Sequence, residues 1–145
     1  MKIRLVLLIS AILVFAQYLS AQISPLPWKP EQMIAPASLV AVIKSDNPQK
    51  PLIINVGPSG LIKGAVNIGP AREDANAESL KKLLAKEKKY KEIIVYCGCC
   101  PYKNCPNIRP AYTILSSMGF ANFKLLDLPQ NLKADWIDRG YPMNK

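Results

Sequence analysis

The sequence predicts an α/β protein with a central parallel sheet and helices on both faces. Short apolar, β-branched segments alternate with amphipathic helical patterns along the chain, as in successive βαβ units. Residues 52–56 are almost continuously apolar, which is typical of a central parallel strand buried on both faces. Once the first residues are set aside, the remainder of the 145-residue chain has the length of a single domain with a hydrophobic core.

The N-terminus is typical of a secretory signal peptide. Lys2 and Arg4 precede the apolar run 5–16, and the small residues Ser20 and Ala21 follow it. We therefore expect residues 1–21 to be a signal peptide cleaved after Ala21, and the protein to be exported to the periplasm or the extracellular space. The alternative is an uncleaved membrane anchor, although the run is shorter than the ~20 residues that a span needs. The membrane is expected as a partner only in that case.

Residues 22–31 are expected to form an extended linker, because their prolines discourage a helix. The predicted domain occupies residues 32–145. Its strands are expected at 33–34, 52–56, 64–68, 93–96 and 123–126. Its helices are expected at 36–44, at 77–88 after an N-cap at Asn76, at 109–118 before Gly119, and at 132–139 before Gly140. Trp136 is expected to anchor the last helix in the core.

The chain is basic, with a net charge of +9. Six lysines lie within residues 81–91, where they suit the solvated C-terminal end of the predicted helix. Nucleic-acid binding is not expected, because aromatic residues or a recognisable module would have to accompany these bases.

All four cysteines, Cys97, Cys99, Cys100 and Cys105, lie between the predicted strand 93–96 and the helix that follows it. A loop at this position lies where open α/β sheets bind small ligands. The chain has no histidine, which excludes a Cys-His catalytic pair, a histidine metal ligand and covalent haem attachment. The sequence therefore predicts sulfur chemistry.

The cysteine spacing leaves several interpretations open. In an oxidising compartment the four cysteines can form two disulfides that clamp the loop. Alternatively, Cys97, Cys99, Cys100 and Cys105 can together bind a soft metal ion, although no metal is favoured and no cofactor is expected. The segment from Cys97 to Cys100 is also formally Cys-x-x-Cys, which suggests a thiol-disulfide oxidoreductase as a further alternative.

Five segments in order resemble the single-domain rhodanese-like family. They are Leu-Ile-Ile-Asn-Val at 52–56, Gly-Leu-Ile-Lys-Gly-Ala-Val-Asn-Ile at 60–68, Ile-Ile-Val-Tyr-Cys at 93–97, Gly-Phe at 119–120, and Ala-Asp-Trp-Ile-Asp-Arg-Gly-Tyr-Pro at 134–142. The resemblance extends over about residues 33–143. It implies the rhodanese-like fold and a sulfurtransferase that carries sulfane sulfur as a cysteine persulfide.

By position, the resemblance makes Cys97 the nucleophile and Arg109 the arginine that closes the active loop. Lys103 and Arg109 supply positive charge for an anionic sulfur donor, and Gly98 lets the backbone approach closely. Cys105 is the alternative nucleophile or a resolving thiol, because it is nearer to Arg109 in sequence. The expected partners are a small anionic sulfur donor and a thiol acceptor, and the protein is expected to be a monomer.

The sequence also departs from the family. Twelve positions separate Cys97 from Arg109, whereas the family has a single short turn there. Asn55 and Gly57 replace the usual Asp and Arg, which removes charges that normally support the site.

Overall fold

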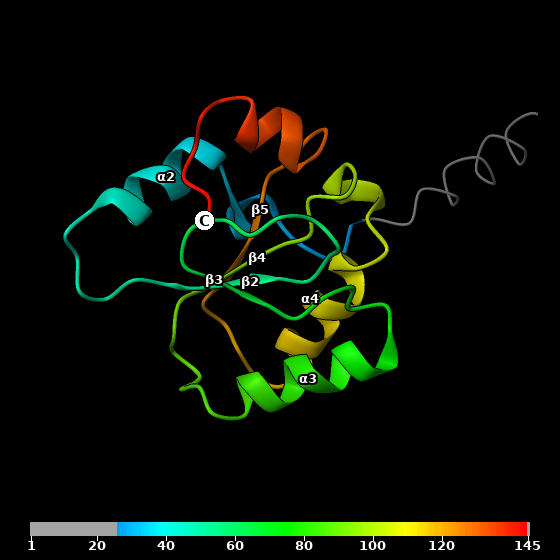
Figure 1. The fold of residues 1–145 in the computed structure, drawn as a ribbon. Helices are drawn as coiled ribbons and strands as arrows, with labels where there is room; N and C mark the ends of the chain where they lie inside the picture. Colours follow the sequence, from blue (N-terminus) through cyan, green and yellow to red (C-terminus); the bar gives the residue numbers. More distant parts are fainter. Residues whose placement is uncertain (1–25, 145) are drawn as a thin grey trace, which may run out of the picture.

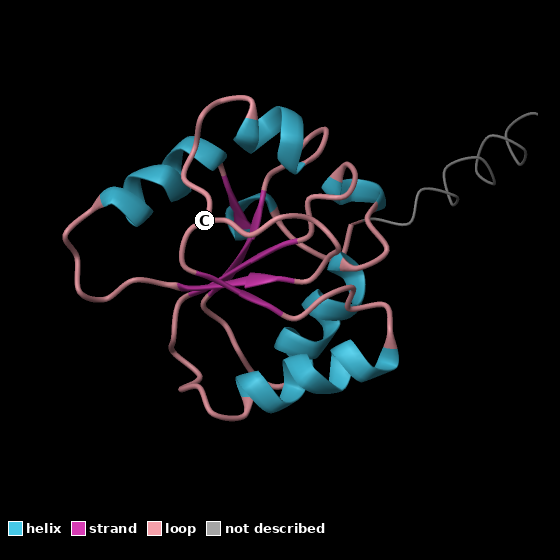
Figure 2. Cartoon of the chain, viewed as in Figure 1, coloured by secondary structure: helices cyan, strands magenta, loops and turns pink. Residues whose placement is uncertain are grey.

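A computed structural model describes residues 26–144 of the chain. It contains a five-stranded parallel sheet in the order β1-β5-β4-β2-β3, with helices on both faces (Figures 1 and 2). The strands are β1 (Met33–Ile34), β2 (Leu52–Asn55), β3 (Ala65–Asn67), β4 (Ile93–Tyr96) and β5 (Phe123–Leu126). The α-helices are α2 (Pro36–Lys44), α3 (Asp74–Leu84) and α4 (Ile108–Ser117). The α/β architecture predicted from the sequence is confirmed.

Strand β4 lies in the middle of the sheet, between β2 and β5, and all four of its residues are buried. Its side chains alternate between the two faces, as a strand requires. Ile93 and Val95 join the core that packs under α3 and α4, whereas Ile94 and Tyr96 join the core under α2. Figure 1 shows α2 on one side of the sheet and α3 and α4 on the other. Residues that follow β4 are therefore held at the centre of the domain.

The structure corrects the predicted helix at 77–88. Helix α3 runs from Asp74 to Leu84, and Glu73 rather than Asn76 occupies the N-cap. The Asn76 side chain lies inside the first turn and donates hydrogen bonds to the Pro70 carbonyl and to the Glu73 carboxylate. The N-cap prediction was wrong because this side chain bonds backward to the preceding turn, and the helix therefore starts earlier.

The predicted helix at 132–139 is shorter than expected. A π-helical segment, η4 (Lys133–Ile137), forms there, and the Asp138 N–H donates to the Lys133 carbonyl at 2.8 Å. The Asp135 carboxylate accepts hydrogen bonds from the N–H groups of Gln130 and Asn131. These bonds hold the loop before residue 132 in a turn, and a regular α-helix does not form there. Trp136 is fully buried, which confirms its predicted place in the core.

The described part of the predicted linker also differs from an extended tether. Trp28 is buried, and its ring lies 6.2 Å from the Tyr102 ring and 5.8 Å from the Tyr112 ring between centroids. A 3-10 helix, η2 (Pro30–Gln32), follows. Trp28 and the partly buried Leu26 therefore anchor this segment to the core, whereas residues 27 and 29–31 stay exposed.

The predicted signal peptide, residues 1–21, lies outside the described residues. Among residues 26–144, no helix has the length and hydropathy required to cross a membrane.

Candidate functional site

The four cysteines lie in the loop between the carboxyl end of β4 and the start of α4. Cys97 directly follows β4, a short 3-10 helix, η3 (Tyr102–Asn104), occupies the middle of the loop, and Asn107 precedes α4. Because β4 is central, this loop leaves the sheet between its neighbours β2 and β5. The structure thus places the Cys-rich loop, residues 97–107, where parallel sheets bind ligands.

Cys97 is held between the exit of β2 and the start of α4. It is 2% exposed. A Cβ atom built on Gly57 would lie 2.3 Å from the Cys97 Sγ and 2.6 Å from its carbonyl oxygen. On the other side, the Asn107 Nδ2 donates to the Cys97 Sγ at 3.3 Å, and the Asn107 Oδ1 accepts from the Arg72 N–H at 3.2 Å. The thiol is therefore fixed in place and receives an oriented amide donor.

Gly98 turns the chain away from Cys97. Its φ of +76° lies in the left-handed region, which favours glycine. A Cβ atom there would also lie 2.6 Å from the Leu132 Cβ and 2.7 Å from the Ser59 Oγ. The Ser59 hydroxyl donates to the Cys97 carbonyl, and the Leu132 N–H donates to the Gly98 carbonyl at 2.9 Å. The start of the loop is therefore anchored from two sides.

Asn55 ties the segment opposite Cys97 together. Its side chain is fully buried, and the Nδ2 donates to the carbonyls of Gly57 and Ser59 at 3.2 and 3.0 Å. The Oδ1 accepts from the Gly57 N–H at 3.1 Å. From the sequence, Asn55 and Gly57 were interpreted only as the loss of two charged residues that the family usually has. In the structure, the amide shapes this turn and the glycine leaves room for the Cys97 thiol.

All four cysteines carry free thiols in the structure. The Cys97 and Cys99 Sγ atoms lie 3.2 Å apart, as do those of Cys99 and Cys100, and the Cys99 and Cys105 Sγ atoms lie 3.9 Å apart. Cys97 and Cys105 are buried, Cys99 is exposed and Cys100 is partly exposed. The Sγ atoms of Cys97, Cys99 and Cys105 all lie within 4.8 Å of one another, so these three thiols could share one metal ion.

The surroundings of Cys97 favour its negatively charged thiolate form. Interaction with the Cys105 thiol lowers the pKa of Cys97, burial opposes this, and the Cys99 N–H and the Asn107 amide lower it further. Burial, followed by the neighbouring thiols of Cys100 and Cys97, raises the pKa of Cys99. The pKa of Cys105 is raised chiefly because its thiol interacts with Cys97. Of Cys97, Cys99 and Cys105, Cys97 is thus the one whose thiolate form the surroundings favour.

Lys103 and Arg109 lie on the outside of the site. Both side chains are exposed. The Lys103 Nζ lies 6.0 Å from the Tyr102 ring centroid, and the Arg109 guanidinium lies 5.7 Å from the Trp28 ring centroid. Within residues 26–144, neither side chain makes a hydrogen bond or an ion pair. Cys97 and Gly98 thus lie at the base of the loop, whereas Lys103 and Arg109 place positive charge on its surface.

The sequence did not identify Asn107 and Ser59 as residues of this site. Asn107 occupies the position before α4, where an asparagine commonly caps the helix, but it makes no side-chain capping bond. Its amide instead joins Arg72 to Cys97. Local sequence gives no signal for a contact that depends on how three separate segments pack.

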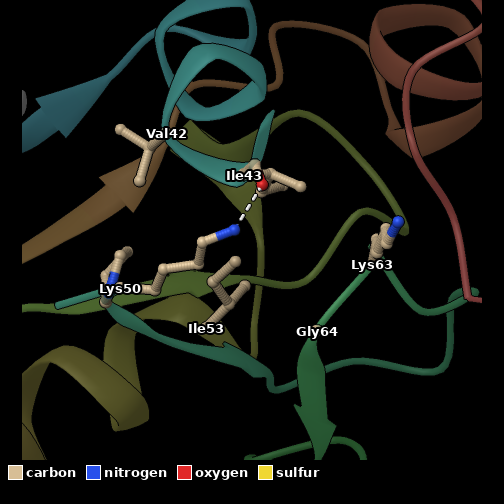
Figure 3. A pocket seen from close by; sticks show the side chains of 7 residues that line it. Val42, Ile43, Lys50, Ile53, Lys63 and Gly64 are labelled. Carbon is tan, nitrogen blue, oxygen red and sulfur yellow. Dashed lines mark hydrogen bonds between the residues drawn. The ribbon is translucent and has the colours of Figure 1, made fainter. Parts of the chain in front are cut away.

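The space beside the thiols is small. The residues packed around the thiols leave no room for a water-sized molecule; they are Cys97, Gly98, Cys100, Tyr102, Cys105, Ile108, Leu126 and Leu128. A different pocket lies near the amino ends of β2 and β3, away from the cysteines, and is lined mainly by apolar residues of α2 and β2 with Lys50 and Lys63 (Figure 3). The Lys50 Nζ donates to the Ile43 carbonyl there at 2.7 Å. Its lining holds no thiol or carboxylate, so the cysteines remain the candidate reactive site.

The comparisons with known proteins agree with this location. The Rhodanese-like domain family matches residues 58–128, a range that contains the whole Cys-rich loop. No curated protein matches the chain.

Three solved structures share the fold. The Alr3790 protein from Anabaena sp. has a TM-score of 0.56 and 20% identity, over 77% of this chain and 90% of that one. The single-domain sulfurtransferase RDL2 from Saccharomyces cerevisiae has a TM-score of 0.53 and 16% identity, over 80% and 95% of the two chains. A cysteine-persulfide form of an EanB variant with ergothioneine has a TM-score of 0.57 and 19% identity, over 78% of this chain and 28% of that longer one.

The family match, the parallel sheet order and these shared folds lead to one identification. Residues 58–128 match the Rhodanese-like domain family, and the chain has a rhodanese-like fold with a Cys-rich loop at the carboxyl end of its central strand.

Proposed function

We propose that the protein is a sulfurtransferase that carries sulfane sulfur as a persulfide on Cys97. The observation that carries this proposal is the position of the thiol. Cys97 follows the central strand, and the Asn107 amide donates a hydrogen bond to its sulfur at 3.3 Å. A thiolate, rather than a thiol, is the nucleophile in sulfur exchange, and these surroundings favour it.

The reaction takes place in two displacements. The Cys97 thiolate attacks the outer sulfur of a donor such as thiosulfate, a bond forms between the two sulfurs, and sulfite leaves with the electron pair of the broken S–S bond. An acceptor thiolate then attacks the outer sulfur of the Cys97 persulfide. The acceptor becomes a persulfide, and the Cys97 thiolate is regenerated without any external oxidant.

The site favours a small anionic donor. Cys97 is 2% exposed and no water-sized space lies beside it, so any donor needs the loop to move before it reaches the sulfur, and a small donor needs the least movement. Positive charge from Lys103 and Arg109 at the loop surface attracts an anion. Backbone N–H groups such as that of Cys99 supply donors for the negative charge that builds up on the persulfide.

The test is a thiosulfate-to-thiol transfer assay on variants with a single changed cysteine. Cys97→Ser is expected to abolish transfer, because oxygen does not form the persulfide. Cys100→Ser is the matched control, since Cys100 lies in the same loop but is not required for either displacement. Transfer that persists in Cys97→Ser and disappears in Cys105→Ser would instead make Cys105 the nucleophile.

We also propose that the protein is exported. The arrangement of Lys2, Arg4 and the apolar run 5–16 supports export. Expression of the full chain in a bacterial host, followed by fractionation and mass measurement, tests it. The expected product is found in the periplasm or medium and begins at Gln22. Retention of residues 1–21 in the membrane fraction would support the anchor instead.

A further inference from the structure

Sulfur transfer requires one thiol, but the loop brings three together. The Sγ atoms of Cys97, Cys99 and Cys105 lie within 4.8 Å of one another. Within residues 26–144, these three side chains form a group close enough to bind one metal ion. The proposed persulfide reaction uses only Cys97. The Cys105 thiol favours the Cys97 thiolate, but the reaction gives no role to the Cys99 thiol, which lies 3.2 Å from the Cys97 sulfur.

The separations fit ligands of a single metal ion. Metal–thiolate bonds of about 2.3 Å allow two sulfurs on one ion to lie at most ~4.6 Å apart. The Cys97–Cys99 and Cys99–Cys105 separations are 3.2 and 3.9 Å, both inside that limit, and the Cys97–Cys105 separation is at most 4.8 Å. Small side-chain rotations would be sufficient to place an ion among the three sulfurs.

The fold holds two of the three ligands rigidly and leaves the third accessible. Cys97 is fixed by Gly57 and Asn107, as described above, and Cys105 is 1% exposed. The Cys105 N–H also donates to the Tyr102 carbonyl at 3.2 Å, which closes the 3-10 turn η3. Cys99 is exposed. An ion can thus enter past Cys99 and meet two sulfurs already in position.

The type of ligand selects the type of metal. The three ligands are all thiolates, which are soft donors suited to Cu(I), Zn(II) and iron–sulfur centres and poorly suited to Mg²⁺ or Ca²⁺. Structural Zn(II) sites almost always have four ligands, whereas this group has three. A three-sulfur site therefore favours Cu(I) over Zn(II).

We propose that the reduced Cys-rich loop binds one Cu(I) ion through the thiolates of Cys97, Cys99 and Cys105. This site goes beyond the sulfurtransferase function and does not depend on it. Both roles use the Cys97 sulfur, so they are mutually exclusive at any moment: bound Cu(I) blocks persulfide formation, and a persulfide removes one ligand. Lys103 and Arg109 on the loop surface partly offset the negative charge of a tris-thiolate site.

The experiment is an anaerobic titration of the reduced mature chain with Cu(I), in competition with a coloured Cu(I) chelator. The expected result is one Cu(I) per chain. Cys99→Ser and Cys105→Ser are each expected to weaken binding by at least ~10-fold, because loss of a ligand should cost no less than loss of an outer-sphere partner. Cys100→Ser is the matched control and is expected to retain binding, since Cys100 lies outside the three-thiol group.

X-ray absorption of the wild-type Cu(I) complex gives a readout that does not depend on how the variants fold. A sulfur coordination number of three is expected. Absence of binding, equal weakening in Cys100→Ser and Cys99→Ser, or Zn(II) binding as tight as that of Cu(I) would each overturn the assignment. Failure here is distinct from failure of the sulfurtransferase proposal, because persulfide formation is measured on metal-free protein and Cu(I) binding without any sulfur donor.

Discussion

At the scale of single residues, the chemistry depends on what surrounds the Cys97 sulfur. The Cys105 thiol, the Cys99 N–H and the Asn107 amide stabilise the thiolate, while burial opposes it, and the pKa of Cys97 is lowered as a result. A lowered thiol pKa means that the reactive form persists at lower pH. Asn107 is the member of this set that can be removed without altering another thiol.

The pH dependence of alkylation tests this environment. In reduced, metal-free protein, the rate of Cys97 alkylation is expected to rise with pH and level off well below the ~8.5 midpoint of a free thiol, within the range of roughly 3.5 to 7.5 seen for activated cysteines. Asn107→Ala is expected to move the midpoint upward. The measurement is peptide-level mass spectrometry of iodoacetamide labelling across pH. A native midpoint equal to that of the denatured chain would contradict the account.

Gly57 is expected to be essential for the position of Cys97. In Gly57→Ala, the new methyl group would lie 2.3 Å from the Cys97 Sγ, so the thiol or the backbone must move. Overpacking of this kind costs typically about 1 to 3 kcal/mol in the free energy of unfolding. Urea unfolding measures it. Gly60→Ala is the control, because its Cβ would meet only the flexible end of Met143, at 3.1 Å, and an equal loss in both variants would refute the specific role of Gly57.

At the scale of elements, strand β4 organises both sides of the site. Cys97 follows it directly, and the Tyr96 hydroxyl at its end accepts a hydrogen bond from the Ile62 N–H at 2.9 Å and donates to the Gly60 carbonyl at 3.1 Å. Burial raises the pKa of Tyr96 to about 12, so the hydroxyl stays protonated at any physiological pH. The strand thus positions the turn after β2 as well as the thiol.

Replacing Tyr96 by phenylalanine tests that link. Tyr96→Phe leaves the Ile62 N–H without its acceptor at a residue that is fully buried, and an unpaired buried donor costs about 1 to 3 kcal/mol. The expected result is a corresponding loss in the free energy of unfolding by urea. Tyr90→Phe should be nearly neutral, because Tyr90 is 72% exposed. No loss in Tyr96→Phe would show that the turn is held by other contacts.

The strands and two of the helices were predictable from the sequence, and the reasons are local. An apolar run such as 93–96 indicates a buried strand. Pro36 marks the first residue of α2, and Gly119, with φ of +78°, follows the end of α4. Two errors occurred at Asn76 and at 132–139, where side chains bond to neighbouring turns, and a third in the predicted linker, where Trp28 is buried. The Cys-rich loop was located by sequence, but its thiol contacts and the role of Asn107 depend on segments far apart in the chain.

At the scale of the whole molecule, the segment before β1 closes one side of the site. Trp28 packs on Tyr102 of the Cys-rich loop and on Tyr112 of α4, and the Arg109 guanidinium lies over its ring. Residues near the start of the described chain therefore contact both the loop and the helix that hold the thiols. The stability of the site and the stability of the domain are linked through this contact.

Truncation of Trp28 is expected to destabilise the whole domain. Trp28→Ala removes a buried aromatic side chain, which costs about 3 to 5 kcal/mol in the free energy of unfolding. Trp28→Phe keeps an aromatic ring and should lose clearly less. Urea unfolding of the chain that begins at Gln22 measures both. A neutral Trp28→Ala would mean that residues 26–32 are the tether that their prolines suggest.

If Cys97 carries the transferred sulfur, that sulfur can be located on it. The measurement is intact and peptide-level mass spectrometry of reduced, metal-free protein before and after exposure to thiosulfate. We expect a gain of one sulfur atom, located on Cys97 and absent from Cys97→Ser. A gain on Cys105 alone, or no gain while all four thiols are shown to be free, would contradict it.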